Sequence, residues 1–329
     1  MEKEQKTIGV LTSGGDAPGM NAVIRAVVRS ALYKKMRIFG IRHGYSGLLA
    51  RDAVELDLRS VSEIMHRGGT VLYTSRCPAF YQEAGVKEGA RACKELGLDG
   101  LIVIGGDGSF RGAYALSQAG IPCIGIPATI DNDVACSEYT IGFDTAVNTV
   151  MELVDKLRDT SQSHDRCSVV EVMGRNSGDI ALNAGLACGA VAILVPEVDI
   201  SLDAVVEKMQ RTLRTGKRHF IIIVAEGVLH QKGLGSAPEV AVQIEARTGV
   251  ETRATVLGYV QRGGTPTAKE RQTASEMGVY AVELLEKDRG SRIVAVRNHQ
   301  ICDFSICEAM MEKHQFSQRR YEIADMISI

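Results

Sequence analysis

The chain has 329 residues, enough for two domains or for one large α/β domain with an insertion. Its formal net charge is −2, and its 38 Lys and Arg residues are interspersed with 40 Asp and Glu residues, which argues against a nucleic-acid-binding surface. The longest apolar runs, such as 190–195 and 220–225, are too short to cross a bilayer, and residues 1–6 are too polar for a signal peptide. The eight cysteines include no Cys-x-x-Cys pair, so we expect a reduced, cytoplasmic protein without a structural metal.

In chain order, the first half repeats a strand, a glycine-rich turn and a helix. The first predicted strand is 7–12, the first predicted helix is 20–33, and the turn between them reads SGGDAPG. The outer glycines of this turn have the spacing of a Walker A loop, but Met20 and Asn21 stand where that loop needs Lys and Ser or Thr. What remains is a glycine-rich turn at the start of a helix, which is suited to binding a phosphate.

Further elements of the first half follow from apolar periodicity and from glycine and proline positions. We predict a strand at 37–41, a loop at 44–49, a helix at 61–66, a polar irregular segment at 72–80 that overhangs a site, a helix at 88–96, a strand at 100–104, a helix at 112–118, a strand at 121–126 and a helix from 142 to about 158.

Carboxylates follow two of these predicted strands directly. The first strand leads into GGDGS at 105–109, and the second leads into PATIDNDV at 127–134, where Pro127 cannot donate a ladder hydrogen bond and ends the strand. If the strands are parallel neighbours, Asp107, Asp131 and Asp133 meet at the carboxyl edge of the sheet, where open α/β sheets bind ligands. Glycine amides suit phosphate oxygens, one carboxylate suits Mg²⁺ and another can accept a hydroxyl proton, so this edge predicts phosphoryl transfer to an alcohol. The alternative is that Asp131 and Asp133 only cap a turn.

The second half repeats the same pattern. The predicted elements are strands at 167–172, 190–195 and 219–225 and helices at 179–188, 238–247 and 268–286. Four arginines near strand or loop ends, Arg166, Arg175, Arg253 and Arg262, predict a second phosphate site, for the acceptor. Alternating strands and helices predict an α/β fold of two doubly wound three-layer domains with mostly parallel sheets and an active site in the cleft between them.

Five motifs together resemble the bacterial ATP-dependent 6-phosphofructokinases, the type A phosphofructokinase family. They are TSGGDAPGMN at 12–21, GGDGS at 105–109, PATIDND at 127–133, EVMGR at 171–175 and RATVLGYVQRGG at 253–264. The similarity begins at about residue 7 and runs in order into the carboxyl-terminal region. GGDG alone would be weak, because NAD kinases and diacylglycerol kinases use similar loops, so the five motifs have to be taken together.

The resemblance implies a glycolytic, allosteric kinase that needs Mg²⁺ and transfers the γ-phosphoryl group of ATP to the 1-hydroxyl of fructose 6-phosphate. It implies an ATP-binding domain of residues 1–142 and 261–311 and a fructose 6-phosphate-binding domain of residues 143–260 and 312–329. Asp131 would be the catalytic base, Thr129 and Asp133 would shape the site, and Arg175 would help neutralise the transferring group.

The resemblance also implies the binding residues. ATP would be held by Gly15, Arg76, Cys77, Gly106, Asp107, Gly108 and Ser109, with Asp107 on the Mg²⁺. The sugar phosphate would be held by Thr129, Asp131, Met173, Gly174, Arg175, Glu226, Tyr259 and Arg262. Arg166 and Arg253 would reach the sugar of a neighbouring subunit, which implies a homotetramer with shared sites. Tyr259 replaces the usual His, and tyrosine can donate a hydrogen bond but carries no positive charge.

The family's effector pocket, which binds ADP or phosphoenolpyruvate, is only partly retained. Its cations are represented by Arg25, Arg29, Arg158 and Lys217. The positions of Leu58, Val191 and Thr215 usually hold Arg, Glu and Lys, so three charges are missing. We therefore expect weak or no regulation by these effectors through this pocket.

Two alternatives remain. Pyrophosphate-dependent phosphofructokinases typically carry Asp at the position of Gly108 and Lys at the position of Ala128, so both residues here favour ATP. A catalytically silent sugar-phosphate sensor would have little reason to keep Asp107, Thr129, Asp131 and Arg175 together.

Overall fold

The computed structural model describes residues 5–328 and forms two compact units. The first holds the chain up to Thr129, Asp133–Thr145 and Arg262–His314, and the second holds Ile130–Asn132, Ala146–Gln261 and the chain from Gln315. The predicted boundaries between the two domains were 142/143, 260/261 and 311/312. Residues 130–132 were not predicted to belong to the second unit. No helix within residues 5–328 combines the length and the apolarity that a membrane crossing needs.

A seven-stranded mixed sheet forms the centre of the first unit, in the order β11-β10-β5-β4-β1-β2-β3. The five inner strands are parallel, and the edge strands β3 and β11 are antiparallel to their neighbours. The strand bounds are β1 Thr7–Ser13, β2 Arg37–Ile41, β3 Ala53–Glu55, β4 Gly100–Gly105, β5 Cys123–Pro127, β10 Arg292–Arg297 and β11 Gln300–Ser305.

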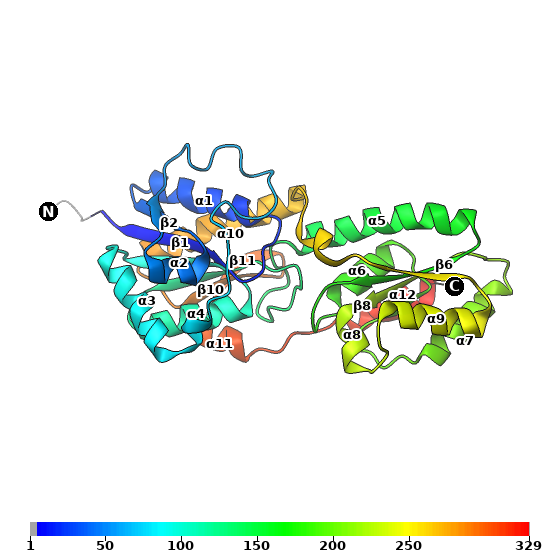
Figure 1. Ribbon diagram of the computed structural model, residues 1–329. Helices are drawn as coiled ribbons and strands as arrows, with labels where there is room; N and C mark the ends of the chain where they lie inside the picture. The colour runs from blue at the N-terminus through cyan, green and yellow to red at the C-terminus, as the bar shows by residue number, and fades with distance from the viewer. Residues whose placement is uncertain (1–4, 329) are drawn as a thin grey trace. The chain divides into compact units, whose positions relative to one another are not determined.

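Helices cover both faces of this sheet (Figure 1). One face is covered by α1 (Met20–Tyr33) and α10 (Ala268–Glu286), which pack against each other. The helices of the other face share an apolar core with the sheet, and they are α2 (Gly44–Ala50), α3 (Glu83–Glu95), α4 (Asp107–Gln118) and α11 (Ile306–Met311). The central strands β1 and β4 are buried along their whole length, which is why they lack the alternation of a half-exposed strand.

The register of the central strands aligns the ends that carry the predicted site. Ser13 pairs with Gly105, and Gly105 pairs with Pro127. The last residues of β1, β4 and β5 therefore lie side by side, and the loops that follow them begin at the same edge. Pro127 is the last residue of β5, as its missing N–H predicted.

The second unit is built on a four-stranded, fully parallel sheet in the order β7-β8-β6-β9. The strands are β6 Cys167–Val172, β7 Ala192–Leu194, β8 Phe220–Ala225 and β9 Thr252–Val256. One face packs in an apolar core with α7 (Leu202–Leu213), α8 (Glu226–Gln231) and α9 (Ala237–Thr248), and further helices of the unit are α5 (Phe143–Ser163), α6 (Asp179–Ala187) and α12 (Gln318–Ile327). The α/β fold with mostly parallel sheets is thus confirmed.

Two predicted elements are wrong. The predicted loop 44–49 is helix α2, because Tyr45 and Leu48 lie on one helical face and are buried in the core of the first unit. The predicted helix 61–66 consists of turns, because Glu63 adopts a left-handed conformation with φ of 52°, which interrupts a right-handed helix. Several elements were not predicted, namely the strands β3, β9, β10 and β11 and the helices α7, α8, α11 and α12.

Helix α2 depends on the absence of a side chain at Gly47. A Cβ at Gly47 would lie 1.5 Å from the Arg42 carbonyl oxygen, so Gly47→Ala must shift the backbone, and we expect a loss of at least about 3 kcal/mol. A matched control is Gly120→Ala, where a Cβ would meet open space and only the left-handed backbone, with φ of 88°, costs about 1–2 kcal/mol. Thermal unfolding followed by circular dichroism compares the two. If Gly47→Ala unfolds no earlier than Gly120→Ala, the close approach at Gly47 is wrong.

Candidate active site

Hydrogen bonds to backbone carbonyl oxygens hold the glycine-rich turn after β1 in place. Ser109 Oγ donates to the Ser13 carbonyl at 3.0 Å, and Thr74 Oγ1 donates to the Gly14 carbonyl at 2.8 Å. Arg262 Nη1 donates to the Asp16 carbonyl at 3.0 Å. A Cβ at Gly15 would lie 2.7 Å from Arg262 Nη1, so the glycine is what lets the guanidinium lie against the turn.

The other predicted ATP residues lie near this turn or at the start of α4. Thr74 comes from the predicted irregular segment 72–80, so that segment does lie against the turn, with Arg76 exposed and Cys77 half-buried. Gly106 precedes α4, and the helix begins at Asp107, which is exposed and 3.1 Å from Arg111 Nη2. A Cβ at Gly108 would meet open space. The amides at such a helix start favour an anion.

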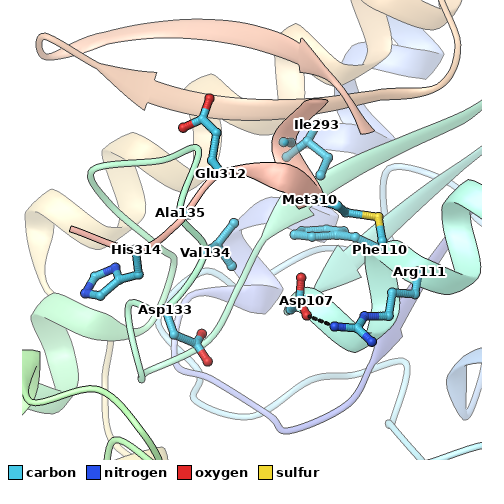
Figure 2. Close-up of a pocket in the computed structure, with 11 residues that line it drawn as sticks. Asp107, Phe110, Arg111, Asp133, Val134, Ala135, Ile293, Met310, Glu312 and His314 are labelled. Atoms are coloured by element: carbon cyan, nitrogen blue, oxygen red, sulfur yellow. Dashed lines mark hydrogen bonds and ion pairs between the residues drawn. The ribbon is translucent and has the colours of Figure 1, made fainter. Parts of the chain in front are cut away.

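A cavity of about 180 Å³ in the first unit brings two predicted carboxylates together. Figure 2 shows Asp107 and Asp133 lining it, with the Asp107–Arg111 ion pair beside them. Glu312 and His314 also line the cavity, and neither residue was predicted to belong to the site. Within residues 5–328 no cluster of three or more Asp, Glu, His or Cys side chains could hold a metal by itself. Mg²⁺ is commonly held by one or two carboxylates plus substrate phosphates, so this donor set fits a metal that arrives with a nucleotide.

Hydrogen bonds to neighbouring segments fix the chain that ends in Thr129. Ala128 N donates to the Gly105 carbonyl, and Ile141 N donates to the Pro127 carbonyl, each at 2.9 Å. Thr140 Oγ1 donates to the Thr129 carbonyl at 2.6 Å. Thr129 is buried, and these three hydrogen bonds fix its carbonyl group and the two residues before it in the first unit.

Asp131 pairs with Arg175 inside the second unit. Asp131 is 1% exposed, and Arg175 Nε lies 3.3 Å from its Oδ2. The Arg175 side chain is 54% exposed, so the pair joins a buried carboxylate to a cation that solvent can reach. A carboxylate beside a guanidinium can accept a proton while the cation stabilises phosphate charge.

A second contact holds the residue after Asp131. Asn132 adopts a left-handed conformation with φ of 51°, which asparagine tolerates better than most residues. Asn132 Nδ2 donates to Asp179 Oδ2 at 2.7 Å, and both side chains are buried. Asp179 is the first residue of α6, where a carboxylate is favoured by the helix dipole.

The carboxyl ends of β6 and β8 gather the predicted sugar contacts. Glu226 Oε1, just after β8, accepts hydrogen bonds from Gly174 N at 3.1 Å and Arg175 N at 2.7 Å. Met173 N donates to Gln261 Oε1 at 3.1 Å. Met173, Gly174, Arg175 and Glu226 are therefore brought together at one edge of the sheet.

Arg166 and Arg253 form a separate cluster at the other edge of the same sheet. Arg166 comes just before β6 and Arg253 lies near the start of β9, and both pair with Glu251, whose pKa the Arg166 hydrogen bond lowers. Tyr259, in the short helix Gly258–Arg262, is 82% exposed. The structure thus does not bring Arg166 and Arg253 of one chain to the edge that carries Arg175.

The phosphofructokinase family model matches residues 7–285 of the chain. The chain belongs to the phosphofructokinase family. It is 52% identical to the ATP-dependent 6-phosphofructokinase of Clostridioides difficile and 51% identical to that of Bacillus subtilis, with 98% of this chain and 100% of each relative covered. A solved structure of phosphofructokinase from Saccharomyces cerevisiae is 35% identical with a TM-score of 0.85, and the match covers 93% of this chain and 44% of the yeast chain.

The residues predicted for the phosphofructokinase effector pocket form two pairs, one in each unit. Arg25 and Arg29 lie one turn apart on α1. The pKa of Arg25 is lowered mainly by its partial burial and, to a smaller extent, by the positive charge of Arg29. Arg158 donates a hydrogen bond to the Cys188 carbonyl. The pKa of Lys217 is lowered mainly by its partial burial and, to a smaller extent, by the positive charge of Arg158. The three positions at which the family's usual charged residue is replaced lie in different environments. Val191 is buried in the core of the second unit, and Leu58 is 54% exposed. Thr215 Oγ1 donates a hydrogen bond to the Thr212 carbonyl.

The Asn132–Asp179 hydrogen bond generates a stability prediction. Asn132→Ala, Asp179→Ala and the double variant should show a coupling free energy of about 1.5–3 kcal/mol, because the acceptor is charged and buried. Any strain of alanine at the left-handed position cancels in this cycle. The exposed Asn183–Arg320 bond, also at 2.7 Å, serves as the control pair and should couple by less than about 1 kcal/mol. Unfolding free energies measure both cycles, and equal coupling in the two would contradict the role given to the buried bond.

Proposed function

We propose that the chain is an ATP-dependent 6-phosphofructokinase that converts ATP and fructose 6-phosphate into ADP and fructose 1,6-bisphosphate. The observation that carries the proposal is an ion pair between the buried Asp131 carboxylate, on the loop after β5, and Arg175, on the turn after β6. In this reaction Asp131 accepts the proton of the 1-hydroxyl, and Arg175 offsets charge on the transferring phosphoryl group. Phosphoryl transfer needs positioning and charge neutralisation more than covalent chemistry, and these residues supply both.

The first unit supplies the nucleotide contacts in this proposal. The turn containing Gly15, the residues Gly106–Ser109 and the start of α4 would bind the phosphates, with Arg76 and Cys77 beside them. Mg²⁺ would be held by Asp107, with Asp133 facing the same cavity, and would shield the charge of the nucleotide phosphates. Thr129 would shape the site between these loops.

The second unit supplies the sugar contacts. Glu226 holds the Gly174 and Arg175 amides, so the turn after β6 is fixed in a shape that can meet the sugar phosphate. Met173 and Tyr259 add further proposed contacts from the second unit, and Arg262, the last proposed sugar contact, belongs to the first unit. Tyr259 offers one hydrogen bond where the family usually has a cation, which should weaken phosphate affinity but not remove it.

We also propose a homotetramer with shared active sites. Arg166 and Arg253 lie at the amino edge of the sheet that carries Arg175 at its carboxyl edge, and β6, with six residues, spans about 20 Å. A single arginine side chain is too short to bridge that length, so these two arginines serve the sugar phosphate of a neighbouring subunit. A cytoplasmic location fits the proposed activity, and the eight cysteines are all free thiols.

The pyrophosphate-dependent reaction is the second candidate, and two positions argue against it. Gly108 leaves open space for the nucleotide, and Ala128 is buried and holds no cation for pyrophosphate. Assays of purified protein with Mg²⁺ and fructose 6-phosphate, run once with ATP and once with pyrophosphate, should give turnover with ATP only. Turnover with pyrophosphate alone would overturn the choice of donor, and no turnover with either would favour the silent sensor.

Replacing the proposed base should remove most of the activity and leave binding intact. In Asp131→Asn the shape is kept but the proton acceptor is lost, so kcat should fall by about 10²–10⁴-fold with little change in the affinity for either substrate. The matched control is Asp203→Asn, which neutralises an exposed surface carboxylate and should keep normal kcat. Steady-state kinetics and binding titrations compare them, and near-normal kcat in Asp131→Asn would refute the assignment.

Shared sites predict complementation between two inactive variants. Arg253→Ala removes an arginine that acts in the active site of a neighbouring subunit, and Asp131→Asn removes the base from the subunit's own active site. A mixed tetramer therefore contains some active sites that have both Asp131 and Arg253. Co-refolded mixtures of the two variants should therefore be more active than either variant alone. In the control, untagged Asp131→Asn is co-refolded with tagged Asp131→Asn, and this mixture should stay inactive. Mixed tetramers, verified by the tag, that recover no activity would show that each site is built from one subunit.

A further inference from the structure

The first unit contains a fully buried carboxylate that the proposed mechanism does not use. Glu270, in the first turn of α10, is 0% exposed, and its burial raises the pKa of the carboxyl. Its Oε1 accepts a hydrogen bond from Tyr139 Oη at 2.7 Å. Its Oε2 accepts hydrogen bonds from Thr145 Oγ1 at 2.9 Å and Thr145 N at 3.1 Å. The carboxylate therefore binds both ends of the segment 139–145.

The start of α10 shows that this arrangement is not ordinary helix capping. Thr267 and Glu270 have the spacing of a capping box, in which the Glu side chain would return to the amide of the Thr. Thr267 Oγ1 does accept from Glu270 N at 3.2 Å. Thr267 N, however, donates to Thr145 Oγ1 at 3.3 Å. The Glu270 carboxylate is thus directed away from its own helix and toward the segment 139–145.

The residues between these two anchors hold the chain that leads to the proposed base. Ile141 N donates to the Pro127 carbonyl, and Thr140 Oγ1 donates to the Thr129 carbonyl. Both donors lie between Tyr139 and Thr145. A shift of the segment 139–145 would therefore move Thr129, two residues before Asp131.

Glu270 also contacts the end of the glycine-rich turn. A Cβ at Gly19, whose φ is 105°, would lie 2.9 Å from Glu270 Cγ and 2.7 Å from Ile141 Cγ2. The buried Glu270 side chain therefore contacts both the turn that we assign to ATP and the segment 139–145, which holds Thr129.

We propose that Glu270 is a positioning residue that sets the placement of Thr129, two residues before the proposed base Asp131, relative to the glycine-rich turn. This inference rests on the proposed function, in which Asp131 is the base. A displacement of about 1 Å in such a site can lower the rate by about 100-fold without removing any group that touches the substrates.

Replacing Glu270 itself could prevent folding, so the test uses its two partners. Tyr139→Phe removes one donor to Oε1, and Thr145→Val removes one donor to Oε2 and the acceptor of Thr267 N. We expect each to lower kcat by about 10–100-fold while the KM for ATP and for fructose 6-phosphate changes by less than about twofold. Thr145→Ser keeps the hydroxyl and should restore kcat to within about threefold of the wild type.

A matched control separates positioning from general loss of stability. Tyr280 also lies on α10, and its hydroxyl donates to Asp303 Oδ1 at 2.6 Å, so Tyr280→Phe breaks a similar tyrosine–carboxylate bond elsewhere in the first unit. All variants are assayed at least about 15 °C below their own melting temperatures, where they are folded. Tyr280→Phe should keep the kcat of the wild type even if its melting temperature falls as much as that of Tyr139→Phe.

The remaining outcomes overturn the inference. If folded Tyr139→Phe and Thr145→Val keep normal kcat, the Glu270 contacts serve stability only. If Tyr280→Phe loses kcat to the same extent, the effect is not specific to the segment 139–145. If Thr145→Ser is as impaired as Thr145→Val, the hydroxyl is not what matters. A wild-type protein that fails to phosphorylate fructose 6-phosphate defeats the proposed function first and this inference with it, whereas an active wild type with active variants defeats this inference alone.

Discussion

The pairing of β4 between β1 and β5 is the constraint on which the rest of the first unit depends. Ser13, Gly105 and Pro127 are matched in register, so three loops leave the sheet at one edge. A slip of one residue in any of these strands would turn the buried side chains to the opposite face, so the apolar core fixes this register. Because the register is fixed, the glycine-rich turn, Asp107 and Thr129 meet at the same edge, although the turn lies far from the other two in the chain.

The second constraint is the environment of Asp131. A buried carboxylate is costly unless it is paired and hydrogen-bonded. Here Arg175 pairs with it, Asn132 is bonded to Asp179, and Glu226 fixes the backbone of Arg175. Arg175 and Asn132 both adopt left-handed backbone conformations, with φ of 53° and 51°, which are sparsely populated for residues other than glycine and cluster at functional sites. The second unit therefore holds the proposed base in a single arrangement at the cost of local backbone strain.

The sequence predicted the elements whose signals are local. The strands ending at Pro127 and the glycine-rich turns were found because proline and glycine restrict the backbone directly, and the family was found from its motifs. Helix α2 was missed because two glycines disfavour a helix that the buried Tyr45 and Leu48 stabilise. Glu270 was overlooked because its spacing from Thr267 reads as a helix cap, while its partners are more than a hundred residues away. The opposite placement of Arg166 and Arg175 likewise follows from strand direction, which motif spacing does not reveal.

The central claim is that this chain moves one phosphoryl group from ATP to the 1-hydroxyl of fructose 6-phosphate. Phosphorus NMR of the wild-type protein with Mg²⁺, ATP and fructose 6-phosphate follows every phosphorus atom in the mixture. The account predicts that the γ-phosphorus signal of ATP falls as ADP and a second sugar phosphate, at carbon 1, rise in equal amounts. Loss of ATP to inorganic phosphate alone, or a phosphate added at any other carbon, would contradict it.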